Sequence, residues 1–249
     1  MELYALVGKP LAHSFSQKYF REKFSREGIE ADYELWEENS VEEALKHIAA
    51  TPELKGFNIT MPYKKAFLPY LDYSDASAEL CGNVNCVKVI RENGKTRLKG
   101  YNTDFYGFET SLEESFNLSA IKTAVILGSG GVSQTIAKVL EKHGISYRIA
   151  SRRTFEDEVH ISYAELDATL SDYRLIINAT PLGMHPYEDC IPPIDTSELQ
   201  ASQCVFDLIY NPSQTLLLQQ AAAKHCPTSN GLCMLTLQAD KAWTIWRND

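Results

Sequence analysis

The sequence lacks any apolar stretch long enough to cross a membrane. A spanning helix needs about 20 consecutive apolar residues, and every apolar run in this chain is much shorter. Long charged or low-complexity tracts, which favour disorder, are missing as well. The amino terminus, Met1-Glu2-Leu3-Tyr4, is acidic and does not have the pattern of a signal peptide. We therefore expect a folded, cytoplasmic protein with no membrane partner.

Positive charge is scarce. The chain has 24 Lys and Arg residues against 33 Asp and Glu residues, which leaves a net charge of −9. Proteins that bind nucleic acid usually carry a basic surface, so we expect no nucleic-acid partner. Hydrophobic residues, by contrast, make up 44% of the 249 residues. That content is enough for the core of one large domain or the cores of two ordinary ones.

Paired cysteines of the Cys-x-x-Cys type are also missing. Cys81 and Cys86 lie close in sequence, but no second pair of Cys or His residues follows to complete a zinc site. His225, Cys226 and Cys233 form another small group without a fourth partner. We expect reduced thiols, as is usual in a cytosolic chain, and no metal.

Apolar patterning in the first hundred residues alternates between strands and helices. It predicts strands over residues 3–7, 33–36 and 56–59, and helices over residues 16–27 and 41–50. This order predicts parallel strands with right-handed crossovers. Asn93-Gly94 is a hairpin signal, because both residues tolerate positive φ. It predicts antiparallel strands over residues 85–90 and 96–99 at the edge of the first sheet.

The second half of the chain begins a new sheet. Strands are predicted over residues 123–127, 147–150, 175–178 and 205–209, and helices over residues 105–115, 132–143, 215–225 and 233–246. The expected fold is α/β with two domains. One comprises residues 1–104, with a mostly parallel sheet, and is rejoined by the carboxyl-terminal helix, residues 235–249. The other is a Rossmann-like domain over residues 105–234.

A glycine-rich turn, Gly128-Ser129-Gly130-Gly131-Val132-Ser133, follows one of these strands and opens a helix. Glycines let a backbone approach a pyrophosphate closely, and a helix amino terminus offers free N–H groups and a positive dipole. Ser133 replaces the third glycine of the usual pattern and is small enough for close helix–strand packing. The turn therefore indicates a dinucleotide site.

The next strand runs into Ser151-Arg152-Arg153. An NAD site favours an acidic residue here, which binds the ribose 2′-hydroxyl, and residues 150–154 contain none. Guanidinium groups suit the 2′-phosphate of NADP. The alternative is an ordinary solvated basic turn. In view of the glycine turn upstream, we expect NADP(H) as the cofactor, bound by this segment.

Two polar segments of the first half add candidates for proton transfer. Lys64 closes the run Asn58-Ile59-Thr60-Met61-Pro62-Tyr63-Lys64, and Asp104 ends Gly100-Tyr101-Asn102-Thr103-Asp104. A lysine and a carboxylate, next to a dinucleotide site, suggest proton transfer coupled to hydride transfer. The simpler interpretations are a solvated lysine and an N-cap for the helix expected from residue 105. Ser14 and Ser16 have two interpretations as well, as helix caps or as donors to a carboxylate.

The chain resembles the shikimate dehydrogenase family over essentially its whole length. Seven ordered motifs carry the resemblance, which makes it far more specific than any one of them. They are G-x-P-x-x-H-S-x-S at residues 8–16, N-x-T-x-P-x-K at 58–64, N-T-D-x-x-G at 102–107, G-x-G-G at 128–131, N-A/S-T-x-x-G-M at 178–184, D-x-x-Y-x-P at 207–212 and G-x-x-M-L-x-x-Q at 231–238.

This resemblance implies reversible, NADPH-linked reduction of 3-dehydroshikimate to shikimate in aromatic amino-acid biosynthesis. It implies that Lys64 and Asp104 form the catalytic pair. The implied substrate-binding residues are Ser14, Ser16, Asn58, Thr60, Asn85, Tyr210 and Gln238. For the cofactor, it adds Thr180, Gly231 and Met234 to the glycine turn and the arginine segment.

Alternatives stay open at this point. A quinate/shikimate dehydrogenase of broader substrate range would carry the same motifs. A nucleotide-sensing binding protein without turnover is a different class, against which the presence of Lys64 and Asp104 argues. Lys64 itself is either the acid/base or an electrostatic anchor that shares the proton transfer with Asp104. Neither a monomer nor a homodimer is favoured by the pattern.

Overall fold

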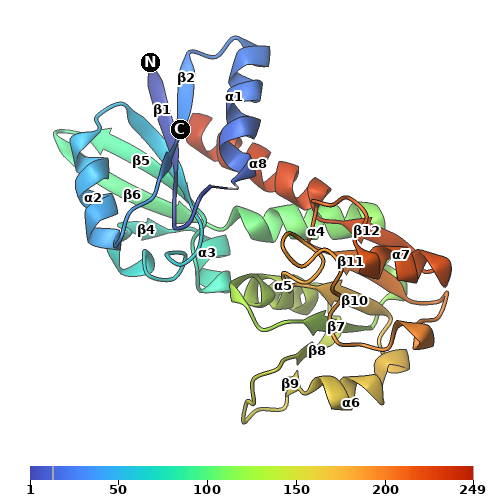
Figure 1. Cartoon of the computed structure of the whole chain (residues 1–249). Coiled ribbons are helices and arrows are strands. Elements are labelled where there is room, and N and C mark those ends of the chain that lie inside the picture. Colours follow the sequence, from blue (N-terminus) through green and yellow to red (C-terminus); the bar gives the residue numbers. More distant parts are fainter. Residues whose placement is uncertain (13, 249) are drawn as a thin grey trace. The chain divides into compact units, whose positions relative to one another are not determined.

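The computed structural model describes residues 1–12 and 14–248 and divides the chain into two compact units (Figure 1). Unit 1 comprises Met1–Thr103 and Ala239–Asp249, and unit 2 comprises Asp104–Gln238. Among the described residues, no helix is both long and apolar enough to cross a membrane.

Unit 1 is built on one six-stranded sheet with the order β2-β1-β3-β5-β6-β4. Strands β1, β2 and β3 are parallel to one another, and β5 and β6 form an antiparallel hairpin beside β3. The elements are β1 (Glu2–Val7), α1 (Phe15–Glu27), β2 (Ala31–Trp36), α2 (Val41–Ala50), β3 (Leu54–Ile59), β4 (Tyr73–Ser74), α3 (Ala76–Cys81), β5 (Cys86–Glu92) and β6 (Lys95–Tyr101).

Side chains of β1 alternate between two cores, one on each face of this sheet. Ala5 and Val7 pack with α2 in one cluster, whereas Tyr4 and Leu6 pack with α1 in the other. A parallel strand covered on both faces is apolar throughout, which explains the run at Leu3–Val7. The second cluster also contains Ala239, Ala242 and Trp246, which lie on the carboxyl-terminal part of α8 (Leu232–Arg247).

Unit 2 contains the second sheet, with the order β12-β11-β10-β7-β8-β9 and every pair parallel. Its elements are α4 (Thr103–Ser115, which starts one residue before the unit), β7 (Thr123–Leu127), α5 (Gly131–Lys142), β8 (Ser146–Ala150), β9 (His160–Ile161), α6 (Tyr163–Asp167), β10 (Leu175–Asn178), β11 (Cys204–Asp207), α7 (Leu216–Ala223), β12 (Thr228–Asn230) and the first part of α8.

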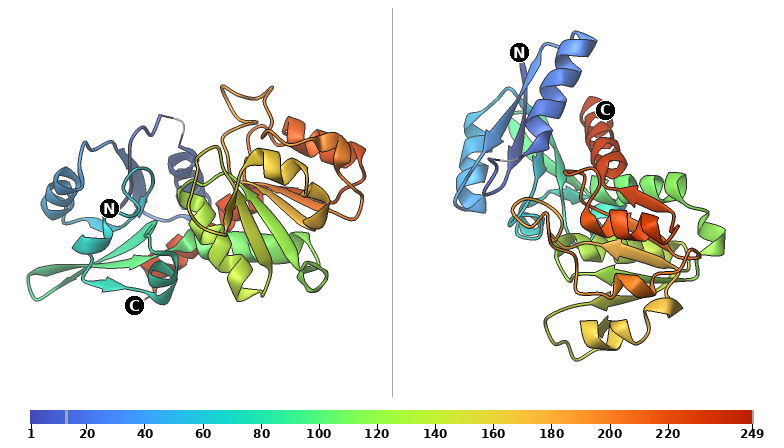
Figure 2. Two further views of the ribbon diagram at one scale, coloured as in Figure 1. Left: turned by 90° about the horizontal axis from the view of Figure 1, so that it is seen from below. Right: turned by 45° about the vertical axis from the view of Figure 1, so that its right-hand side comes forward.

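Helices cover both faces of the second sheet (Figure 2). On one face, α6 and α7 contribute Leu166, Leu217 and Leu218 to a core with the sheet. On the other face, Phe108 of α4 meets Phe206 of β11, with ring centroids 5.3 Å apart. This is the doubly wound arrangement that the alternating pattern predicts, so the expected two-domain α/β fold is confirmed.

Several predicted boundaries need correction. The strand predicted over residues 205–209 ends at Asp207, and the helix predicted from residue 105 begins at Thr103. The predicted hairpin is confirmed, with Asn93 and Gly94 at φ 51° and 72°. It does not form the edge of its sheet, because the two-residue strand β4 pairs with β6. Strands this short carry no detectable alternation.

Candidate active site

The first sheet has a topological switch point between β1 and β3. The chain leaves β1 for its neighbour β2 on one side and reaches β3 on the other side. In open α/β sheets, ligands bind at the carboxyl ends of the strands at such a point. Here the described segments that directly follow the two strands are residues 8–12 and 60–64. They are joined by backbone hydrogen bonds from Lys9 to Met61 (3.0 Å) and from Thr60 to Val7 (2.9 Å). Two of the predicted substrate segments therefore lie side by side.

Ser14 is the N-cap of α1, where its hydroxyl accepts a hydrogen bond from the Ser16 amide at 3.3 Å. Of the two cap interpretations, the one for Ser14 is confirmed, whereas Ser16 lies inside the first turn. Both side chains are half-buried. They stand at the amino end of a 13-residue helix, where the dipole and unpaired N–H groups favour an anion. His13, part of the same motif, lies outside the described residues.

Lys64 lies on a turn that the core holds in place. The residue before it, Tyr63, is buried and donates from its hydroxyl to the Glu38 carbonyl at 2.8 Å. Phe67, whose amide donates to the Tyr63 carbonyl at 3.0 Å, is fully buried. The carbonyl of Lys64 itself accepts from the Val84 amide at 2.9 Å. Lys64 is half-buried, whereas Lys65 is exposed, so the backbone presents these two neighbouring lysines differently.

Asn58 and Asn85 belong to a buried polar network at the same end of the sheet. Asn58 accepts from the Tyr33 hydroxyl at 2.8 Å and donates to the Asn85 carbonyl at 3.1 Å. The side-chain oxygen of Asn85 accepts from the Thr103 amide at 2.7 Å, at the start of α4. The Asn85 side chain also donates to the Thr103 hydroxyl at 3.1 Å. The side chains of Asn58 and Asn85 are therefore both held by protein partners. Tyr33 was not predicted from the sequence, because nothing in a buried aromatic indicates its partner.

The second sheet has its own switch point, between β7 and β10. The glycine turn follows β7, and Thr180 follows β10 in a loop that begins at Ala179. Gly128 has φ 103°, and a Cβ at this position would lie 2.9 Å from the Thr180 methyl carbon. The turn and the loop therefore touch, and only glycine satisfies both the backbone angle and the close approach.

Serine side chains form hydrogen bonds at the glycine turn. Ser133 is buried and donates to the Gly128 carbonyl at 2.7 Å, and the Ser129 and Ser151 hydroxyls lie 3.0 Å apart. Among the described residues, no neighbouring atom lies within 4 Å of the positions that a Cβ would take at Gly130 or Gly131. That open space, at the amino end of the 12-residue helix α5, fits the pyrophosphate of a dinucleotide.

Ser151, Arg152 and Arg153 directly follow β8, which pairs with β7, the strand that leads into the glycine turn. The buried Ser151 hydroxyl accepts from the Arg153 amide at 3.0 Å, which gives the segment a local turn. Both arginine side chains are exposed. They are therefore accessible to the 2′-phosphate of a cofactor that binds from solvent. Tyr163, which faces Arg152, has a pKa raised above its ordinary value by burial and lowered in part by that guanidinium.

The remaining predicted residues of unit 2 follow β10, β11 and β12. Thr180 donates to the Asn178 side chain through its amide (3.0 Å) and its hydroxyl (2.7 Å). Tyr210 is half-buried, and burial raises its pKa. Met234 is buried in the first turns of α8, and Gln238, on the same helix, donates to the Leu235 carbonyl at 2.9 Å.

Lys64 belongs to unit 1, and Asp104 is the first residue of unit 2. The interpretation of Asp104 as an N-cap is wrong, because α4 already begins at Thr103. Asp104 lies within the first turn, where a carboxylate is stabilised by the positive end of the helix dipole. Its role as the catalytic partner of Lys64 stays a prediction.

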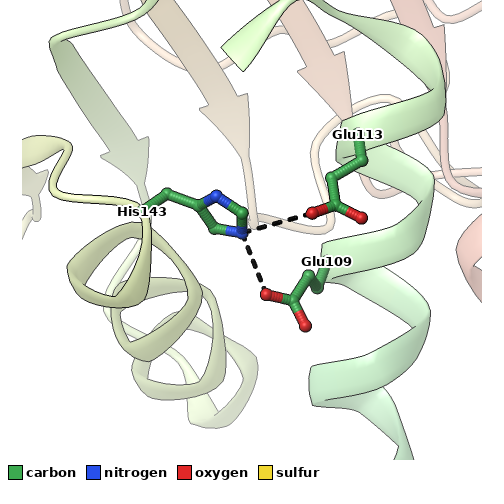
Figure 3. A group of neighbouring side chains, drawn as sticks. All are labelled: Glu109, Glu113 and His143. Carbon is green, nitrogen blue, oxygen red and sulfur yellow. Dashed lines mark hydrogen bonds and ion pairs between the residues drawn. The ribbon is translucent and has the colours of Figure 1, made fainter. Parts of the chain in front are cut away.

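One group of described side chains outside these loops has the donor atoms that a metal would need (Figure 3). Glu109 and Glu113 of α4 face His143, whose Nε2 lies 2.9 Å and 3.7 Å from their carboxylate oxygens. The Lys142 ammonium lies 2.8 Å from Glu109 as well. The Lys142 ammonium and the His143 ring thus already face these carboxylates, and the group ties α4 to the end of α5. It lies about 18 Å from the glycine turn, at the other end of a 12-residue helix.

The chain is similar to proteins of one family over its whole length. Residues 6–87 match the family model described as the shikimate dehydrogenase substrate binding domain. The chain is 35% identical to the shikimate dehydrogenase (NADP(+)) of Methanococcus maripaludis, across 98% of this chain and 91% of that protein.

Solved structures agree with this similarity. The shikimate 5-dehydrogenase of Thermus thermophilus, in complex with NADP(H) and shikimate, has a TM-score of 0.84 and 28% identity, over 99% of this chain and 94% of that one. The quinate dehydrogenase of Corynebacterium glutamicum, in complex with NAD, has a TM-score of 0.87 and 26% identity, over 99% and 93%. By its full-length similarity and its ordered motifs, the chain belongs to the shikimate dehydrogenase family.

Proposed function

We propose that this chain catalyses the NADPH-linked, reversible reduction of 3-dehydroshikimate to shikimate, a step of aromatic amino-acid (chorismate) biosynthesis. The main support is that the family motifs lie at the switch points of the two sheets. Family motifs flank the switch point of the first sheet at residues 8–16 and 58–64, and that of the second sheet at residues 128–131 and 178–184. Ligand sites of open α/β sheets lie at such positions.

Each unit has its own part in this proposal. Unit 1 binds the substrate, with its carboxylate at Ser14 and Ser16 and its ring hydroxyls at Asn58, Thr60 and Asn85. Unit 2 binds NADP(H) through the glycine turn and the segment at residues 151–153. Tyr210, in the loop after β11, and Gln238 of α8 are the further substrate-binding residues of the proposal. The proposal keeps the domains predicted from the sequence. Residues 1–104 and 235–249 bind the substrate, and residues 105–234 bind the cofactor. The proposal also includes a cytoplasmic location.

NADPH supplies the hydride that converts the ketone carbon to an alcohol carbon. As that carbon is reduced, negative charge develops on its oxygen, and a nearby proton donor lowers the barrier. Lys64 is proposed to donate this proton, because a lysine ammonium group is a hydrogen-bond donor. In the oxidation of shikimate the proton must return to the protein. Lys64 and Asp104 are the pair proposed to take it up.

The test is a spectrophotometric assay of the purified protein. Shikimate and NADP together should produce NADPH, seen as an increase in absorbance at about 340 nm, and NADP should be used with higher kcat/KM than NAD. If the protein binds NADPH but does not turn over shikimate, the proposed enzymatic activity is refuted. The alternative of a nucleotide-sensing binding protein is then supported.

The same assay with quinate tests the alternative of a broader substrate range. This alternative is favoured by the similarity to the quinate dehydrogenase of Corynebacterium glutamicum. We expect the kcat/KM for quinate to be at least about tenfold below that for shikimate. A site fitted to one substrate discriminates against another that lacks or adds a hydrogen-bonding group. Comparable values for the two substrates would support the alternative.

A further inference from the structure

Asp207, the last residue of β11, carries a carboxylate that is fully buried. Three hydrogen-bond donors point at it. One oxygen accepts from the Asn178 side-chain amide at 3.0 Å and from the Ile209 backbone amide at 3.1 Å, and the other accepts from the Thr215 hydroxyl at 2.6 Å. An ionised carboxylate has only acceptors to offer, so it matches this set of donors.

Burial raises the pKa of Asp207 to about 6, against the lowering effect of its hydrogen bonds to Thr215, Ile209 and Asn178. At neutral pH the group is therefore still charged. A buried charge is unfavourable unless hydrogen bonds compensate it, and each donor of this network is correspondingly held in place.

The network reaches into the loop that follows β10. Asn178, which donates to Asp207, also accepts from both the amide and the hydroxyl of Thr180. The same Asn178 side chain donates to the Leu182 carbonyl at 3.2 Å. The carboxylate thus orients the amide that sets the position of Thr180.

The network also reaches the two segments that follow β11 and β12. Thr215 is the N-cap of α7, and Ile209 accepts from the Gly231 amide at 3.1 Å at the start of α8. Tyr210 stands next to Ile209 in the chain. A Cβ at Gly231 would collide with the carbonyl oxygen of Leu208, so the segment after Asp207 has no room to shift toward α8.

We infer that Asp207 is a positioning residue for the reaction. Through its hydrogen bonds to Asn178 and Ile209, its carboxylate holds in register the three loops that carry Thr180, Tyr210 and Gly231. The inference rests on the proposed function, together with the family resemblance, which implies Thr180 and Gly231 for NADP(H) and Tyr210 for the substrate. Asp207 acts through its neighbours and touches neither ligand in this scheme.

The test compares Asp207→Ala with Asp207→Asn and with a matched control. Asp207→Ala leaves three donors without their acceptor, so the Kd for NADPH, followed by NADPH fluorescence, should rise about tenfold. Its kcat with shikimate and NADP should fall about tenfold to a hundredfold, since misplacement of about 1 Å has effects of that size. Asp207→Asn keeps one acceptor oxygen for Asn178 and Ile209, and it should recover most of both losses.

Gln203→Leu is the control, because Gln203 is equally buried but precedes the other end of β11, where it donates to the Leu170 and Tyr173 carbonyls. It should lower Tm without changing the Kd or kcat. If Asp207→Ala does not fold, Thr215→Val removes one donor and should raise the Kd for NADPH severalfold.

A Kd and kcat within about twofold of the wild type, in a folded Asp207→Ala variant or in Thr215→Val, overturn the inference. The same kinetic losses in Gln203→Leu overturn it as well. A wild-type protein that binds NADPH but does not oxidise shikimate refutes the proposed function instead. In that case, the NADPH Kd of the variants still decides the role of Asp207.

Discussion

At the scale of single residues, Lys64 and Lys65 form a natural pair for comparison. Tyr63 and Phe67 anchor the turn on which both stand, yet only Lys64 is half-buried. We predict that Lys64→Ala lowers kcat by about 10²- to 10⁴-fold, the range of general acid catalysis, and leaves Tm nearly unchanged. Lys65→Ala should keep wild-type kinetics. A near-native kcat for Lys64→Ala would remove this residue from the mechanism.

The variant Lys64→Arg separates the two roles proposed for this side chain. Arginine keeps the positive charge but does not give up its proton. If Lys64 is an electrostatic anchor, Arg should retain much more activity than Ala. If Lys64 transfers the proton, the kcat values of the two variants should be similarly low.

The exposed guanidinium groups of Arg152 and Arg153 are predicted to select the cofactor. Loss of a hydrogen bond to a charged group corresponds to about 1.5–3 kcal/mol. The double variant Arg152→Ser/Arg153→Ser should therefore lower kcat/KM for NADPH by at least about tenfold and leave that for NADH within about twofold.

The control for this cofactor experiment is Arg148→Ser, since Arg148 is an exposed arginine on β8, the strand that precedes the same turn. It should change neither value. A wild-type preference for NADH over NADPH would contradict the assignment of the two arginines.

The raised pKa of Asp207 predicts how stability changes with pH. Its pKa is about 6 in the folded protein and 3.8 in the reference state. At a pH between these two pKa values, Asp207 keeps its proton in the folded state and has lost it in the unfolded state. The contribution of Asp207 to stability therefore falls as the pH rises from about 4 to 6. Asp207→Asn does not titrate. The free energy of unfolding of this variant, relative to wild type, should increase by up to about 3 kcal/mol across that range. A pH-independent difference, measured by urea unfolding, would contradict the shift.

At the scale of elements, Arg91 of β5 shows how a strand supports a helix. Its guanidinium donates to the carbonyls of Ile48, Thr51 and Leu54, at the end of α2 and the start of β3. These include carbonyls that the helix end leaves without an intrahelical partner. We predict that Arg91→Met lowers the free energy of unfolding by about 2–4 kcal/mol, because several acceptors lose a charged donor.

Chemical denaturation with a matched variant checks this prediction. Arg97→Met is the control, because Arg97 lies on the other strand of the same hairpin, is exposed and donates to the Tyr73 hydroxyl. Its change should stay within about 0.5 kcal/mol. Equal effects of the two variants would show that charge on the hairpin matters more than the carbonyl contacts.

The long elements could be predicted, and the short ones could not. Apolar periodicity over α1, α2 and α5 spans several turns, so it identifies each helix. Strands β9 and β12 have two and three residues, and they exist because a neighbouring strand supplies their hydrogen bonds. The early start of α4 has a similar cause, since Asn85, from a remote segment, binds the Thr103 amide.

At the scale of the whole molecule, the chain crosses between the units twice, and both crossings fall in helices. The first lies at Thr103/Asp104 in α4, and the second lies at Gln238/Ala239 in α8. The second part of α8 completes the core of unit 1. There Trp246 stacks on Tyr4 with ring centroids 4.8 Å apart and donates to the Val87 carbonyl at 3.0 Å.

Trp246→Ala should therefore destabilise unit 1 selectively, by about 3–5 kcal/mol, the range for removal of a buried aromatic. Calorimetry should show one transition at lower temperature, while NADPH still raises the temperature of the transition that belongs to unit 2. Thr244→Ala, an exposed position on the same helix, is the control. Loss of NADPH binding in Trp246→Ala would contradict separate cores.

The sequence by itself determined the α/β class, the glycine turn, the hairpin at Asn93-Gly94 and the family, through its ordered motifs. These features are local. Each depends on residue types within a few positions of one another, such as periodic apolar residues in a helix or a glycine that tolerates positive φ.

Only the tertiary structure decided which of these segments meet. The two switch points, the anchored turn of Lys64 and the network around Asp207 all depend on strand order. The residues that each strand brings together lie from 8 to about 50 positions apart in sequence. No local preference encodes such a partner, because it is selected by the joint burial of apolar faces on both sides of each sheet. For that reason Asp207 appears in the sequence only as one letter of a motif. In the structure it is the central acceptor of a network that reaches three loops, directly or through Asn178 and Ile209.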